Sequence, residues 1–270
     1  MTLLKLFNMI NNKIVILAFL TCFYSISQNE SIFLHKQFID GNDTLKYRLL
    51  VPKKLKKRSK YPLHLFLHGF GERGSDNKQQ LKYVAGLFIN QRNRNYYKTF
   101  GVFPQCPDDD SWSTRKIVKS NDGLNHKFYD NKKPTNALRL VMKLMDSLTS
   151  TQNVNKNRVY VSGLSNGGMG TFELLYRKPD MFAAAVPICG GGNVKTAKIF
   201  ARKTPVWIFH GAQDDIVSPL YSVNMVEAIL KEGGKPKFTL YDNVAHDSWT
   251  NAFKEKNYFK WIYSHKKISK

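Results

Sequence analysis

The chain has 270 residues, of which 42 % are hydrophobic and 13 % aromatic, more than a disordered chain contains, so most of it is expected to fold. Its 42 Lys and Arg against 20 Asp and Glu give a formal net charge of +22, which bears on solubility and partners rather than on fold. The sequence has no fixed repeat and no sustained heptad, which excludes collagen-like and coiled-coil arrays, and its three cysteines are too few for a disulfide scaffold or a zinc site of four thiolates.

The first residues have the pattern of an export signal. Lys5 and Lys13 precede an apolar segment over residues 14–24. This segment has about the length of a signal-peptide core and is short for a membrane span. Small residues follow, so we predict a signal peptide over 1–27 and a secreted or periplasmic protein. An uncleaved anchor and a lipoprotein signal that uses Cys22 are the alternatives. No later segment is apolar and long enough to span a bilayer, so no stable membrane insertion is expected after signal removal.

The predicted elements begin with a hairpin, in which strands over 32–38 and 44–51 flank the turn Asp40-Gly41-Asn42-Asp43. An exposed basic loop over 53–60 follows. Beyond it, short apolar strands alternate with helical segments, and the apolar residues are continuous rather than alternating, as in strands covered on both faces. These strands are predicted over residues 63–67, 100–105, 159–163, 183–188, 206–209 and 238–241.

Two of the helices are indicated by apolar residues at three- and four-residue spacing, over 136–148 and 221–230, the second ended by glycines. Residues 107–133 form the least regular stretch and are expected to be a surface loop near the strand ends. No Pro-, Gly- or Ser-rich linker divides the chain. The pattern therefore predicts one α/β domain, with a mostly parallel central sheet, helices on both faces and an N-terminal antiparallel hairpin.

The sharpest motif is Gly163-Leu164-Ser165-Asn166-Gly167, which matches G-x-S-x-G. It lies directly after a predicted strand and before a predicted helix, the context of a nucleophile elbow. The turn is so tight that the positions two before and two after the serine must have almost no side chain. This geometry holds the hydroxyl of Ser165 at the carboxyl end of the sheet, so Ser165 is the predicted nucleophile.

A serine hydroxyl needs a base, and the base in turn needs an acid that orients it. Of the seven histidines, His246 is the candidate because it lies in a loop after a late strand, from which a mobile imidazole can reach the serine. The acid is expected between Ser165 and His246 in the chain, after the strand at 206–209. Asp214 is the predicted acid; the adjacent Asp215 is the alternative, with helix capping as its other possible role.

A glycine-rich segment, His68-Gly69-Phe70-Gly71-Glu72-Arg73-Gly74, follows the strand at 63–67. Acyl transfer places negative charge on the carbonyl oxygen, which fixed N–H donors must stabilise. The backbone amides of Asn166 and Phe70 are the predicted donors of this oxyanion hole, because they belong to the residue after the nucleophile and to the loop after the early strand. Glu72 and Arg73 are expected to brace the loop.

The order Ser165, Asp214, His246 resembles that of the α/β-hydrolase superfamily. More narrowly, the chain is similar to the secreted esterase and peptidase-like group related to polyhydroxybutyrate depolymerases, feruloyl and acetylxylan esterases and dienelactone hydrolase. The segments that carry this narrower resemblance are 68–74, 104–107 with Trp112, 163–168, 187–192 and 246–249. The resemblance covers about residues 30–265 and implies that residues 28–270 form a single catalytic domain.

The predicted function is that of a secreted serine carboxylesterase that works through an acyl-enzyme. Trp112 and Trp249 are predicted to line an open aromatic cleft for an acyl or sugar ring; packing between loop and helix is the alternative for each. The expected substrate is a small-molecule ester or an acyl group on plant or algal polysaccharide. A serine peptidase of the prolyl-oligopeptidase type and a non-catalytic binding protein are the alternative functions.

No metal and no organic cofactor is expected, and Cys106 and Cys189, which follow predicted strands, are expected to be separate thiols. The positive charge has two interpretations. It can reflect solubility or a lysine-rich composition, or it can attract acidic polysaccharide or an anionic cell surface. Binding to nucleic acid is not expected, because no nucleic-acid-binding motif accompanies the charge. The sequence leaves the oligomeric state open.

Overall fold

The computed structural model of the protein describes residues 32–120, 123–151 and 153–267. The predicted signal peptide over 1–27, with Cys22, therefore lies outside the described residues. The described residues from 35 onward form one compact unit, to which all the predicted site residues belong.

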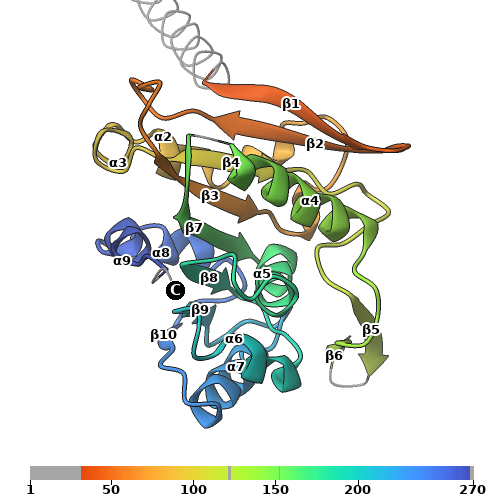
Figure 1. The fold of residues 1–270 in the computed structure, drawn as a ribbon. Helices are drawn as coiled ribbons and strands as arrows, with labels where there is room; N and C mark the ends of the chain where they lie inside the picture. Colours follow the sequence, from red (N-terminus) through yellow and green to blue (C-terminus); the bar gives the residue numbers. More distant parts are fainter. Residues whose placement is uncertain (1–31, 121–122, 152, 268–270) are drawn as a thin grey trace, which may run out of the picture. The chain divides into compact units, whose positions relative to one another are not determined.

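A sheet of eight strands in the order β1-β2-β4-β3-β7-β8-β9-β10 is the framework of the fold (Figure 1). Strand β2 pairs with β4 in antiparallel fashion, whereas the neighbours from β4 to β10 pair in parallel. The predicted α/β fold, with its mostly parallel sheet and N-terminal hairpin, is confirmed. The strands are β1 (Phe33–Asp40), β2 (Asp43–Leu50), β3 (Tyr61–Leu67), β4 (Phe100–Pro104), β7 (Val154–Leu164), β8 (Ala184–Ile188), β9 (Trp207–Gly211) and β10 (Lys237–Tyr241).

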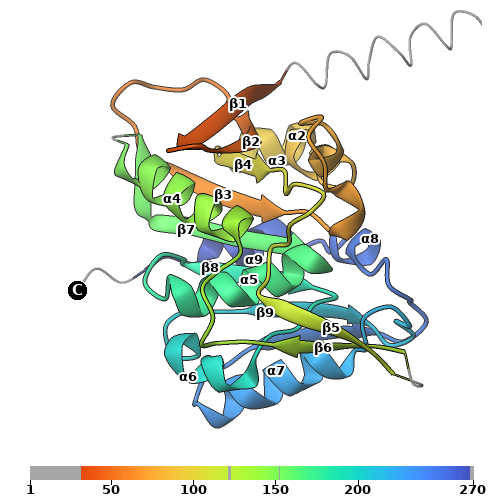
Figure 2. The same ribbon diagram turned by 90° about the vertical axis from the view of Figure 1, so that its right-hand side faces the viewer.

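Helices lie on both faces of this sheet: α4 and α5 cover one face and α9 the other (Figure 2). The α-helices are α2 (Ala85–Ile89), α3 (Gln91–Tyr96), α4 (Asn136–Ser150), α5 (Asn166–Arg177), α6 (Ala197–Phe200), α7 (Leu220–Lys231), α8 (Trp249–Ala252) and α9 (Tyr258–Ser264). Three short 3-10 helices are η1 (Phe70–Glu72), η2 (Gln79–Leu81) and η3 (Val194–Thr196). Thr135 caps α4, since its hydroxyl accepts a hydrogen bond from the Leu138 amide.

The two faces of the sheet differ in composition because successive side chains of β3 point to opposite sides. Leu63 and Leu65 join a mostly aliphatic core with the apolar stripe of α4. His64 points the other way and packs edge to face against aromatic rings, including Phe88 and Tyr263. The inner strands β3, β8 and β9 are thus buried on both faces, as the sequence predicted for a parallel sheet. The prediction is wrong for β10, because this strand at the edge of the sheet is partly exposed.

The stretch over 107–133, predicted as a loop, contains a hairpin, and this part of the prediction is wrong. Strands β5 (Arg115–Ser120) and β6 (Gly123–Phe128) pair in antiparallel fashion and form a second, two-stranded sheet. The hairpin is attached to α7, because the amide of His126 donates to the hydroxyl of Tyr221 at 2.7 Å. Its strands are rich in Lys and Arg and lack a clean apolar alternation, which removes the usual sequence signal for a strand.

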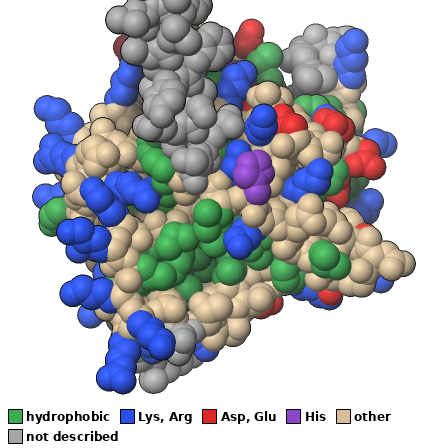
Figure 3. Space-filling view, turned by 90° about the horizontal axis from the view of Figure 1, so that it is seen from above, with side chains coloured by type: hydrophobic (Ala, Val, Ile, Leu, Met, Phe, Trp, Pro, Cys, Tyr) green, Lys and Arg blue, Asp and Glu red, His purple; other side chains and the backbone are tan. Residues whose placement is uncertain are grey.

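On the face that Figure 3 shows, Lys and Arg side chains are distributed around the surface rather than gathered in a single patch. Among the residues that the structure describes, no helix has the length and apolarity needed to cross a membrane.

Candidate active site

Ser165 lies at the turn between β7 and α5, with φ 53° and ψ −116°, a conformation that few residues other than glycine adopt. Glycines make this turn possible. A Cβ atom at Gly163 would collide with the carbonyl of Gly167, and one at Gly167 would collide with the carbonyl of Leu67 in β3. The hydroxyl is thereby fixed at the carboxyl ends of the parallel strands, the geometry that the G-x-S-x-G spacing predicted.

The structure brings the predicted nucleophile, base and acid together. Nε2 of His246 lies 2.9 Å from the hydroxyl oxygen of Ser165. Nδ1 of the same imidazole lies 2.8 Å from a carboxylate oxygen of Asp214. When Nδ1 carries the proton and donates it to the carboxylate, Nε2 is left as an acceptor for the serine hydroxyl. His246 is partly exposed, whereas Asp214 is buried.

Asp214 is held by several donors. Burial by itself raises the pKa of its carboxyl, but hydrogen bonds from His210, His246 and the Val217 amide outweigh burial and hold the pKa well below its usual range. Nε2 of His210 lies 3.0 Å from the carboxylate and 2.9 Å from the Val217 carbonyl, so this nitrogen carries a proton. The alternative acid, Asp215, is exposed and has no such contacts among the described residues.

The loop predicted to supply an oxyanion donor is fixed by its own side chains. Phe70 begins η1 and Asn166 begins α5, so neither amide has an acceptor within its helix. Glu72 accepts a hydrogen bond from the Gly69 amide at 3.0 Å, and burial raises the pKa of its carboxyl. The guanidinium of Arg73 lies 3.4 Å from the ring centre of Phe70 and donates to its carbonyl. Glu72 and Arg73 therefore brace the loop.

The side chain of Asn166 belongs to a polar group next to the nucleophile that the sequence did not predict. Its carbonyl oxygen accepts hydrogen bonds from the hydroxyl of Ser111 at 2.8 Å and from Nη1 of Arg115 at 2.7 Å. Its amide nitrogen is buried without a partner, as is Nε2 of His126 on the neighbouring strand β6. No sequence signal marks Ser111 or Arg115, because the hairpin that carries Arg115 was itself missed; His210 could have been noticed from its position four residues before Asp214.

The two predicted cleft tryptophans have different environments. Trp112 is fully buried, packs on the edge of the His68 ring at 5.2 Å and would contact any side chain placed at Gly170. The structure therefore corrects the prediction that Trp112 lines an open cleft: it has the packing role that was the alternative. Trp249 is partly exposed and lies edge to face with His246, with 5.5 Å between ring centres.

One set of side chains near the nucleophile has the composition of a metal site: donor atoms of Cys189, Asp214 and His246 lie within 4.8 Å of one another. Burial raises the pKa of the Cys189 thiol, which disfavours the thiolate that a metal requires. Nδ1 of His246 is already engaged by Asp214. The arrangement therefore favours acid–base chemistry over metal binding. Cys106 and Cys189 are both buried free thiols.

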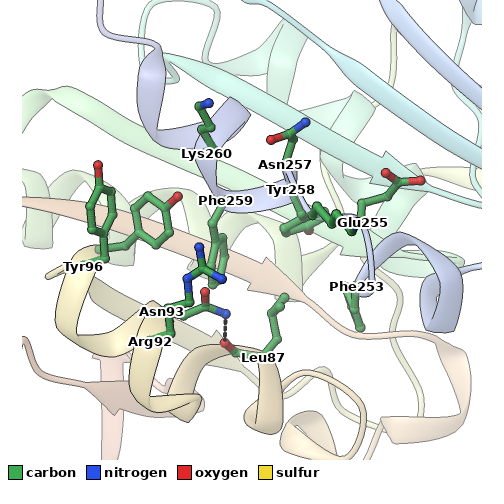
Figure 4. Close-up of a pocket in the computed structure, with 12 residues that line it drawn as sticks. Leu87, Arg92, Asn93, Tyr96, Phe253, Glu255, Asn257, Tyr258, Phe259 and Lys260 are labelled. Carbon is green, nitrogen blue, oxygen red and sulfur yellow. Dashed lines mark hydrogen bonds between the residues drawn. The ribbon is translucent and has the colours of Figure 1, made fainter.

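A cavity of about 580 Å³ lies elsewhere, between α3 and the segment that leads into α9 (Figure 4). Its lining combines aromatic rings with the cationic residues Arg92, Lys256 and Lys260 and the acidic Glu255. None of the predicted site residues contributes to this lining. The chemistry of the site is therefore not inferred from this cavity.

A serine on a strained strand–turn–helix, hydrogen-bonded to a histidine that is oriented by a buried aspartate, at the carboxyl ends of a mostly parallel sheet, defines an α/β-hydrolase. Residues 54–262 match the phospholipase/carboxylesterase family, and the chain belongs to this family. The class that this family defines is that of phospholipases and carboxylesterases.

Individual relatives agree with this class. The chain is 34 % identical over 91 residues to a bifunctional acetylxylan esterase/xylanase of Neocallimastix patriciarum, and 37 % identical over 51 residues to a poly(3-hydroxyalkanoate) depolymerase C of Paucimonas lemoignei. These matches span 13 % and 12 % of the length of the two relatives. A thermostable esterase structure superposes with a TM-score of 0.76 at 33 % identity, over 88 % of this chain and 64 % of that one. A ferulic acid esterase, at 15 % identity and a TM-score of 0.64 over 86 % and 97 % of the two chains, shares the fold.

Proposed function

We propose that the protein hydrolyses carboxylic esters through an acyl-enzyme formed on Ser165. The observation that carries this proposal is the alignment of three groups, with His246 Nε2 2.9 Å from the Ser165 hydroxyl and His246 Nδ1 2.8 Å from Asp214. Ser165 attacks the ester carbonyl while Nε2 takes up its proton, and Asp214 stabilises the imidazolium that forms. The imidazolium then returns the proton to the departing alcohol.

The amides of Asn166 and Phe70 stabilise the oxyanion of the tetrahedral intermediate. Support comes from their positions at the starts of α5 and η1, where backbone N–H groups have no helical acceptor. Water then attacks the acyl-enzyme while His246 takes up a proton from this water. The imidazolium returns this proton to the Ser165 oxygen as the bond to the acid product breaks, which restores the free enzyme. Every proton that moves in this cycle passes through one imidazole, which Asp214 orients throughout.

The substrate part of the proposal is an acyl group on a polysaccharide, cleaved outside the cell or in the periplasm. Its support is the local similarity to an acetylxylan esterase, together with the signal-peptide pattern over residues 1–27. Trp249 beside His246 offers an apolar surface for a sugar or acyl ring.

The decisive experiment compares kcat/KM for ester and anilide substrates that carry the same acyl group, together with acetylated xylan and a peptide library. We expect turnover of esters, release of acetate from the polysaccharide and little cleavage of amides. The matched control is Ser165→Ala, which should abolish turnover and covalent labelling by a serine-directed phosphonate. Efficient cleavage of peptides without turnover of any ester would show that the protein is a peptidase and not an esterase. Absence of all turnover and labelling in the wild type would show that it is a non-catalytic binding protein.

A further inference from the structure

A cavity of about 320 Å³ adjoins the loop that carries Phe70. Three cationic side chains line it: Arg73 from that loop, Arg115 from β5, and Lys132. The cavity is thus bounded on one side by the predicted oxyanion loop and on another by the β5–β6 hairpin, and positive charge converges on it from both.

Arg115 connects this cavity to the reaction centre. Its Nη1 donates to the side-chain oxygen of Asn166, the residue that directly follows the nucleophile, at 2.7 Å, and to the Ser111 hydroxyl at the same distance. Its Nε donates to Nδ1 of His126 at 3.3 Å. All these acceptors are neutral, and no ion pair to Arg115 is found in the described part of the chain. A guanidinium without a carboxylate partner has capacity for an anionic ligand.

Arg73 adds a second charge without a carboxylate partner. It stacks on Phe70 and donates to two backbone carbonyls, those of Phe70 and Asp110. The carboxylate of Asp110 is directed elsewhere, because its oxygens accept hydrogen bonds from the Ser111 and Ala137 amides. Asp109 also lines the cavity, but its side chain is exposed.

From this juxtaposition we propose that Arg115 and Arg73 form a subsite for a carboxylate carried by the ester substrate, which makes the enzyme selective for anionic esters. The inference rests on the proposed function and names the substrate class of the same site. Nε and Nη1 of Arg115 already donate within the protein, so Nη2 is the nitrogen that can donate to a carboxylate. Arg73 adds a second guanidinium, and donors from two arginines can fix the register of the substrate as well as attract it.

The electrostatics of the two guanidinium groups agree with this assignment. Burial and the nearby charge of Arg73 lower the pKa of Arg115 to about 10, and the carboxylate of Glu173, which is engaged by Thr114 and Arg177, only partly opposes them. Arg115 is therefore charged at neutral pH. A bound carboxylate would offset both the burial of this charge and its repulsion from Arg73. The ligand that fits is therefore an anion.

The test uses pairs of esters that differ only in charge, in which a carboxamide replaces the carboxylate. Mono-ethyl glutarate and ethyl 4-carbamoylbutanoate place the group on the acyl side, whereas 3-acetoxypropanoate and 3-acetoxypropanamide place it on the alcohol side. Acid release in a pH-stat gives kcat/KM for each compound. We expect the wild type to prefer the carboxylate about tenfold or more on one side, and that side identifies the part of the substrate that occupies the subsite.

Variants then assign the preference to the arginines. Arg115→Met and Arg73→Met should each reduce the ratio of charged to uncharged kcat/KM toward one, while Arg115→Lys should retain part of it. Because the ratio is taken within each variant, a general loss of activity or stability cancels. Arg58→Met is the matched control, since it removes an exposed guanidinium from the basic loop before β3 and should leave the ratio unchanged.

Two outcomes would overturn the subsite, and they are distinguishable from failure of the proposed function. If the wild type hydrolyses uncharged esters through Ser165 but shows no preference for either carboxylate, the subsite is wrong and the esterase stands. If the preference survives loss of both arginines, another group is responsible. If no ester is hydrolysed, the proposed function fails and the subsite, which depends on it, fails with it.

Discussion

Two histidines of the described residues make nearly the same hydrogen bond through Nε2 to a serine. Nε2 of His246 lies 2.9 Å from the hydroxyl of Ser165, and Nε2 of His64 lies 2.8 Å from the hydroxyl of Ser162. Their other ring nitrogens differ, because Nδ1 of His246 faces a carboxylate whereas Nδ1 of His64 lies 3.0 Å from the neutral hydroxyl of Tyr263. Burial lowers the pKa of His64 to about 3, so this imidazole stays neutral at any ordinary pH.

The difference between the two pairs separates a structural contact from a reactive one. A base must accept a proton and be stabilised once charged, which requires a nearby anion and access to the substrate. The pair with Ser165 has both, and its serine has the strained backbone of a tight turn. The pair with Ser162 has neither, because it lies fully buried among aromatic rings. A serine–histidine hydrogen bond is therefore insufficient evidence for a nucleophile.

Removing the two serine hydroxyls should separate the pairs most strongly. Ser165→Ala should lower kcat by about 10⁵- to 10⁶-fold with little change in stability, because the elbow glycines are untouched. Ser162→Ala should keep kcat within a few-fold and instead lower the free energy of unfolding by about 1–3 kcal/mol, since a buried ring nitrogen loses its partner. Steady-state kinetics and urea unfolding on both variants check this; equal losses of activity would remove the distinction.

Substitution of the carboxylate that faces His246 is a second test of the comparison. Asp214→Asn should reduce kcat by about 10⁴-fold, because an amide cannot hold the imidazole in the reactive tautomer or stabilise its charge. Asp215→Asn, the matched control one residue away on an exposed side chain, should leave kcat within about twofold. The reverse ranking would transfer the role of the acid to Asp215.

The smallest effect concerns the buried pair and the pH dependence of stability. Unfolded chains protonate histidine near pH 6.5, while folded His64 stays neutral down to about pH 3, so the unfolded state binds more protons in this window and stability falls as the pH is lowered through it. His64→Gln should reduce the slope by up to about 1.4 kcal/mol per pH unit between pH 6 and pH 4. Urea unfolding at several pH values measures this slope.

Tyr263→Phe provides the control for this experiment. It removes the hydroxyl that faces Nδ1 of His64 but keeps the titrating imidazole in its apolar surroundings. Stability should fall by about 1 kcal/mol at every pH with the slope nearly unchanged. If the slope of stability against pH is the same in His64→Gln as in the wild type, then His64 does not differ in protonation between the folded and unfolded states, contrary to what its burial indicates.

The parts of the fold that sequence predicted are those whose patterns are local. Apolar strands such as the one that ends at Leu67, and the elbow glycines around Ser165, follow from periodicity and from backbone space. The β5–β6 hairpin was missed because Arg115 and its neighbours are polar and because their position depends on the distant Tyr221. The prediction for Trp112 was wrong for a related reason: the sequence identifies an aromatic residue but does not show whether its ring faces solvent or the core.

Within the site, chain order and the convergence of the strand ends at one edge of a parallel sheet indicated His246 and limited the acid to Asp214 or its neighbour Asp215, and the contacts of the buried Asp214 then distinguish the two. The partners around them were not accessible in this way. His210 contacts Asp214 from the end of β9, four residues earlier in the chain, but its spacing does not say that its ring turns toward the carboxylate. Arg115 contacts Asn166 from the distant hairpin, a contact that no single segment encodes. The reactive groups are thus more predictable than the residues that hold them.

The hairpin β5–β6 pairs as a sheet of its own, outside the eight-stranded ladder that positions Ser165, Asp214 and His246. Changes in its length or side chains can therefore alter the wall beside the nucleophile while the register of the catalytic strands stays the same. Such an arrangement allows the range of accepted substrates to diverge in evolution, or to be changed by loop exchange, at little risk to the reaction itself.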